Sequence, residues 1–113
     1  MRKLDLKKYT ISIRDAKGVT QSIPYDFKES LIQLMFHPNL KLSGKALLET
    51  NIVAEKLMKA DKEILLEEEE YNKIKSAIDG FQGFSQNEVR LVERIYNCPQ
   101  IDVKEKKTEF SNN

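Results

Sequence analysis

Two short stretches near the N-terminus have the pattern of paired β-strands. Residues 9–14 carry an apolar side chain at every second position, and residues 19–23 begin and end on one, which is typical of half-buried strands. Between them, Asp15 opens a turn and Gly18 closes it, as in hairpins whose last turn residue needs a positive φ. The sequence therefore predicts an antiparallel β-hairpin over about residues 6–23, which Pro24 ends.

Four later segments repeat their apolar residues at the three-to-four-residue spacing of an α-helix. Capping residues mark several of their starts: Asp26 with Glu29, Ser43, and a Ser-x-x-Glu capping box over residues 85–88. Prolines or glycines follow several of their ends. The predicted helices cover residues 26–36, 43–60, 67–80 and 86–97.

Two further segments predict short strands: an apolar run at residues 64–66, and an alternating stretch at residues 101–103. The predicted fold class is therefore α+β, an N-terminal β-hairpin followed by about four helices, with one or two short extra strands. The apolar sides of these elements give the predicted core: Ile11, Ile13, Val19, Ile23, Phe27, Leu31, Leu34, Leu47, Ala54, Leu57, Ile74, Ile78, Val92 and Ile95.

Length and charge limit the organisation of the chain. Its 113 residues are 40% apolar and 33% charged, which predicts a single domain, residues 1–103, with a densely charged surface. Residues 104–113 are charged and lack an apolar period, so we expect a flexible tail there. Nineteen Lys and Arg nearly balance 18 Asp and Glu, which argues against a strongly basic nucleic-acid binder.

The single cysteine and the short apolar runs bear on location. One cysteine allows no intrachain disulfide, which is typical of a reducing compartment. The charged N-terminal segment lacks the apolar region of a signal peptide, and no apolar run approaches the length of a transmembrane helix. We therefore expect a cytoplasmic protein of a bacterial host cell that does not contact the membrane.

The sequence carries no recognisable catalytic, metal-binding or cofactor-binding motif. His37 and Cys98 could act as base and nucleophile, but no signature surrounds them, and a capping histidine and a buried cysteine explain them as well. One cysteine and one histidine are too few for a structural zinc site. The four glutamates at residues 67–70 point about 100° apart on a helix and cannot converge on one ion. We expect a non-enzymatic protein without a cofactor or metal.

The first two predicted helices carry more apolar residues than one buried face of a small domain needs. The surplus predicts a surface for a protein partner, although a small domain could also enclose it. The candidate partner surface is Ile32, Met35, Phe36, Leu48 and Ile52.

Self-association is a related prediction. The first hairpin strand has no proline, and only Lys7, Lys8 and Arg14 at its ends oppose pairing with another strand. We therefore expect a homo-oligomer, most simply a dimer. The alternative is a monomer in which residues 101–103 cover the edge of the hairpin.

Nucleic-acid binding is the alternative function. Acidic residues Glu88 and Glu93 in the fourth helix disfavour a helix-turn-helix, because they would face phosphates. Basic residues gather instead at the two ends of the chain. The candidate contacts are Arg2, Lys3, Lys7, Lys8, Arg14, Lys104, Lys106 and Lys107.

The small size, the abundance of Lys, Glu, Ile and Asn, and two segments together carry a compositional resemblance. The segments are Tyr-Asp-Phe-Lys-Glu-Ser-Leu at residues 25–31 and His-Pro-Asn-Leu-Lys-Leu-Ser-Gly at residues 37–44. In its size, composition and these two segments, the chain resembles small uncharacterised proteins of bacteriophages and prophages of low-GC bacteria. The resemblance implies an assembly, accessory or host-interference role that depends on binding surfaces.

Overall fold

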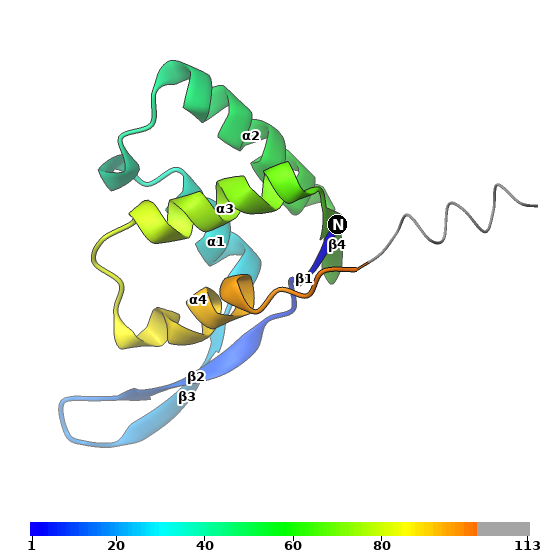
Figure 1. Cartoon of the computed structure of the whole chain (residues 1–113). Helices are drawn as coiled ribbons and strands as arrows, with labels where there is room; N and C mark the ends of the chain where they lie inside the picture. The colour runs from blue at the N-terminus through cyan, green and yellow to red at the C-terminus, as the bar shows by residue number, and fades with distance from the viewer. Residues whose placement is uncertain (102–113) are drawn as a thin grey trace, which may run out of the picture.

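A computed structural model describes residues 1–101 and confirms the α+β class, with an N-terminal hairpin and four α-helices (Figure 1). Two short 3-10 turns, η1 and η2, complete the described part of the chain. In order, the elements are β1 (Arg2–Asp5), β2 (Tyr9–Arg14), β3 (Thr20–Tyr25), α1 (Phe27–Met35), η1 (Pro38–Leu40), α2 (Gly44–Lys59), β4 (Glu63–Leu66), α3 (Glu68–Gly80), η2 (Gln86–Glu88) and α4 (Val89–Tyr96).

The predicted hairpin is formed by β2 and β3, which pair antiparallel from Tyr9 opposite Tyr25 to Arg14 opposite Thr20. Asp15 holds the turn, because its carboxylate accepts the backbone N–H groups of Lys17 and Val19, both at 2.9 Å. Gly18 adopts φ +83° there, a conformation that favours glycine. The hairpin projects from one end of the helical body (Figure 1).

A second sheet, which the sequence analysis did not anticipate, joins the start of the chain to its middle. β1 pairs antiparallel with β4, with Leu4 opposite Ile64, so the apolar run at residues 64–66 is a strand as predicted. On the other side of β1, the N–H of Lys3 donates to the carbonyl of Pro99 at 3.0 Å. β1 therefore lies between two segments that are distant in sequence.

The last predicted strand needs correction. Pairing occurs at Gln100, which bridges to Arg2, and at Ile101, whose N–H donates to the Met1 carbonyl at 2.8 Å. This segment therefore lies beside β1 and does not cover the hairpin edge. Residues 102 and 103 of the predicted strand, and the predicted tail, lie outside the described residues.

α1 is the central helix of the core. Asp26 caps its start by accepting the Glu29 N–H at 3.1 Å, as the capping pattern predicted. Because α2 and α3 both pack against α1, its residues are buried on more than one side. Its buried residues are Phe27, Leu31, Ile32, Leu34 and Met35.

The predicted core is right for most helix positions and is wrong for Val19 and Leu47. Val19 and Leu47 are 53% and 45% exposed: Val19 directly follows the hairpin turn, and Leu47 lies on the flank of the first turn of α2. Ile11, Ile13, Ile23 and Val92 are only partly buried. The predicted core omitted buried residues in the second sheet and around it: Leu4, Leu6, Ile64, Leu66, Tyr71 and Leu91. Cys98 is buried, as its structural interpretation predicted.

Candidate functional site

α2 exposes an unusual concentration of apolar side chains. Four of the eight large hydrophobic residues that are exposed within residues 1–101 belong to this helix: Leu47, Leu48, Ile52 and Met58. Leu48 and Ile52 lie opposite the buried face of α2, and we call these two residues the α2 patch, whereas Leu47 and Met58 lie on the flank of the helix. Leu48 and Ile52, one helical turn apart, are 69% and 66% exposed. α2 lies at the opposite end of the molecule from the hairpin (Figure 1).

Local sequence explains why α2 has two apolar faces. The Ser43 hydroxyl caps the helix by accepting the Ala46 N–H at 3.1 Å. Val53, Ala54 and Leu57 are at most 2% exposed, and they form the side that faces the core. Leu48 and Ile52 lie on the opposite side of the same cylinder. The core therefore requires one face of α2 and leaves the other uncovered.

The structure exposes part of the predicted partner surface and buries the rest. Leu48 and Ile52 are exposed as predicted, whereas Phe36 is partly buried against the core. Ile32 and Met35 are only 8% and 1% exposed, so assigning them to a partner surface was wrong. The central position of α1 is the reason, because α2 and α3 cover both of its sides.

A groove of about 630 Å³ lies between the start of α2 and α3. Its lining is mixed, with about as many polar and charged residues as apolar and small ones. The apolar lining comprises Met35, Leu40, Leu42, Ala46 and Ala77, and the polar lining comprises Glu49, Thr50, Glu69, Asn72, Lys73 and Ser76.

The two candidate catalytic residues have structural roles in separate places. The Nδ1 atom of His37 accepts the Asn39 N–H at 3.2 Å and thereby caps η1, and its ring meets Phe81 edge-on. Cys98 is buried, and its Sγ lies 3.3 Å from the Lys3 carbonyl oxygen. Burial raises the pKa of the Cys98 thiol, which disfavours the reactive thiolate. No hydrogen bond or aromatic contact among residues 1–101 joins His37 to Cys98.

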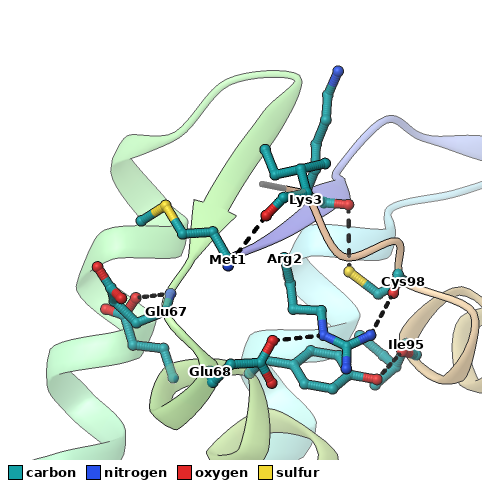
Figure 2. A network of polar contacts seen from close by, with 10 residues as sticks. Met1, Arg2, Lys3, Glu67, Glu68, Ile95 and Cys98 are labelled. Atoms are coloured by element: carbon teal, nitrogen blue, oxygen red, sulfur yellow. Dashed lines mark hydrogen bonds and ion pairs between the residues drawn. The ribbon is translucent and has the colours of Figure 1, made fainter. Parts of the chain in front are cut away.

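Arg2, a candidate nucleic-acid contact, is held in a network of polar contacts beside β1 (Figure 2). Its Nε donates to Glu68 and its Nη1 to the Cys98 carbonyl, both at 2.9 Å. The guanidinium also lies 4.5 Å from the centre of the Tyr71 ring. Arg2 thus joins β1, α3 and the segment after α4.

The other basic candidates differ in their surroundings. Lys3 pairs with Glu63 at 3.2 Å and Lys8 with Asp26 at 3.7 Å, which offsets their charge locally. Lys7 and Arg14 are exposed. The three tail lysines, Lys104, Lys106 and Lys107, lie outside the described residues.

Two arginines of α4, which the sequence analysis did not single out, hold the base of the hairpin. Arg94 Nη1 donates to the carbonyls of Asp5 and Lys7 at 3.2 and 2.8 Å, and its guanidinium lies over Tyr9. Arg90 donates to the Thr10 carbonyl at 3.0 Å. That carbonyl is on the outer edge of β2, so α4 covers part of the edge considered for self-association.

Comparison with known protein families, with curated proteins and with solved structures finds no significant match. Within residues 1–101, no helix is both long and apolar enough to cross a membrane. In the same part of the chain, no three His, Cys, Asp or Glu side chains are grouped to hold a metal ion.

Proposed function

We propose that this chain is a non-enzymatic protein that acts by binding another protein, and that the α2 patch is its contact surface. One observation carries the proposal: Leu48 and Ile52 are about two-thirds exposed on a helix that already buries its opposite face. Single exposed hydrophobic residues are ordinary. Leu48 and Ile52 are neighbours on the outer face of α2, and together they form a patch of the kind that partners cover.

The energetic reason is the hydrophobic effect. Full burial of a leucine or isoleucine side chain is worth about 1.5–3 kcal/mol. With two-thirds of each side chain left in water, Leu48 and Ile52 together forgo roughly 2–4 kcal/mol. A partner that covers the patch recovers this free energy. The assembly, accessory and host-interference roles implied by the compositional resemblance all require such a surface.

Site-directed photocrosslinking in bacterial cells tests the proposal. A photoreactive residue at position 52 should give a covalent adduct heavier than the 13.1 kDa chain, since this position faces the partner. The same residue in place of Glu93, which is exposed on α4, is the matched control and should give none. Leu48→Asp, which keeps the fold because Leu48 is exposed, should remove the adduct. Equal adducts at positions 52 and 93, or none at 52, would contradict the proposal.

Nucleic-acid binding is a second candidate, and one observation favours it. The pairing of Gln100 with Arg2 brings the basic N-terminal strand beside the start of the C-terminal segment. Fluorescent DNA and RNA titrated at low and at moderate salt test it, because phosphate contacts weaken steeply with salt. Salt-sensitive binding at micromolar protein would support this function, and its absence would end it.

A further inference from the structure

We infer that the partner of the α2 patch is a second copy of this chain, whose α2 lies antiparallel to the first across a two-fold axis. This inference rests on the proposed function and adds to it the identity of the partner and the register of the contact. It follows from the order of apolar and charged residues along the outer face of α2.

The outermost residues of α2 follow the spacing of a two-helix seam. All are exposed, and they recur at intervals of three and four positions, which places them on one stripe opposite the buried face. The stripe, from the start of the helix to its end, is Lys45, Leu48, Ile52, Glu55 and Lys59.

An antiparallel pairing centred on Thr50 matches the apolar part of the stripe with itself. Leu48 of one copy then lies opposite Ile52 of the other, and the two-fold axis repeats the contact. In heptad terms, Leu48 and Ile52 occupy the two core positions, d and a, and an antiparallel pair places an a position of one helix opposite a d position of the other. The two most exposed aliphatic side chains of the helix therefore cover each other in both copies.

The same alignment also matches two of the three charged residues of the stripe, while Lys59 lies beyond the helix overlap because position 41 precedes α2. Lys45 lies opposite Glu55 of the second copy, on each side of the apolar centre. Within residues 1–101, neither side chain takes part in an ion pair; Glu55 accepts only the side-chain amide of Asn51, at 3.2 Å. A parallel pairing would instead place Lys45 against Lys45 and Glu55 against Glu55. Charge complementarity thus selects the antiparallel arrangement.

The contact is narrow, so the dimer should dissociate on dilution. Sedimentation velocity from about 10 to about 500 µM protein should show a monomer that converts to a dimer with rising concentration. Leu48→Asp should abolish the conversion, because it places a charge in the apolar centre. A chain that stays monomeric at the highest concentration would overturn the inference.

Charge reversal tests the register. Lys45→Glu and Glu55→Lys should each weaken the dimer about tenfold, because each replaces two attractions with two repulsions. The double variant should return to within about threefold of the wild type, since the carboxylate now at position 45 faces the ammonium now at position 55 of the other copy. The two positions lie almost three helical turns apart in one chain, so the rescue can arise only between chains. A double variant as weak as the single ones would overturn the inference.

Two controls make the same charge changes away from α2. Lys17→Glu at the hairpin tip and Glu93→Lys on α4 should leave the dimer unchanged, and equal effects from them would contradict the register. The outcome also separates this inference from the proposed function. A monomeric chain that crosslinks at position 52 to a different protein would overturn the inference and leave the proposed function standing.

Discussion

Two tyrosine hydroxyls are shielded from water, and they differ in whether they form a hydrogen bond. The Tyr71 hydroxyl is buried and donates to the Ile95 carbonyl at 2.7 Å. The Tyr9 hydroxyl is also shielded from water but has no hydrogen-bond partner within residues 1–101. We expect Tyr71→Phe to lower the free energy of unfolding by about 1–2 kcal/mol, because it leaves a carbonyl unpaired. Tyr9→Phe should leave the free energy unchanged or raise it. Urea denaturation measures both, and equal losses would contradict the prediction.

The same Tyr9 hydroxyl predicts a loss of stability at alkaline pH. Burial, with a further contribution from Tyr25, raises its pKa from 10.0 to about 12. Between these values the unfolded chain releases the proton and the folded chain keeps it, so the free energy of unfolding falls as pH rises. Tyr9→Phe lacks this contribution, and the stability of the variant relative to the wild type should increase through this window. Urea denaturation at a series of pH values measures the difference, and parallel curves would count against the prediction.

We expect the β2–β3 hairpin to be the least stable part of the described structure. β2 and β3 pair only with each other in the part of the chain that the structure describes, and Ile11, Ile13 and Ile23 are partly exposed. Two-stranded hairpins are only marginally stable. We therefore expect the amides of β2 and β3 to exchange with solvent faster than those of α1 and α3. Exchange measured by NMR would contradict this if the hairpin were protected as well as the helices.

Two glycines offer a matched test of the hairpin turn. Gly18 has φ +83°, so Gly18→Ala should cost about 1–2 kcal/mol in the turn and speed exchange in β2 and β3 selectively. At Gly44, in the first turn of α2, an added Cβ meets nothing within 4 Å and the φ is ordinary. Gly44→Ala should stabilise α2 by about 0.4–1 kcal/mol. Similar effects of the two variants would show that the turn is not strained.

At the scale of the whole molecule, β1 holds the chain together. It pairs with β4 on one side and with the segment after α4 on the other, and Arg2 adds the bonds of Figure 2. Leu4 is 1% exposed at its centre. Leu4→Ala should therefore cost about 2–5 kcal/mol of stability. Ile11→Ala, a partly exposed site on the hairpin, should cost less than about 1.5 kcal/mol. Thermal and urea denaturation would contradict this ranking if Ile11→Ala were the more damaging change.

Local signals in the sequence were sufficient for most of the elements. The β2–β3 hairpin and the four helices follow from residue spacing, from the caps Asp26, Ser43 and Ser85, and from the turn at Gly18. These signals act within a few residues, so they have the same meaning in any tertiary context. β1 gave no such signal. It carries one inward apolar residue, Leu4, among charged neighbours, and it became a strand because β4 and Gln100 are there to pair with it.

The predicted partner surface was also decided partly by sequence and partly by tertiary structure. The sequence shows that the first two helices carry more apolar residues than a small core needs, but spacing alone does not show which helix lies at the centre. α1 is covered by α2 and α3, so Ile32 and Met35 became core. α2 lies at the margin, so Leu48 and Ile52 remain in water. Amphipathicity is a property of each helix, whereas burial depends on how many neighbours pack around it, and those neighbours come from distant parts of the chain.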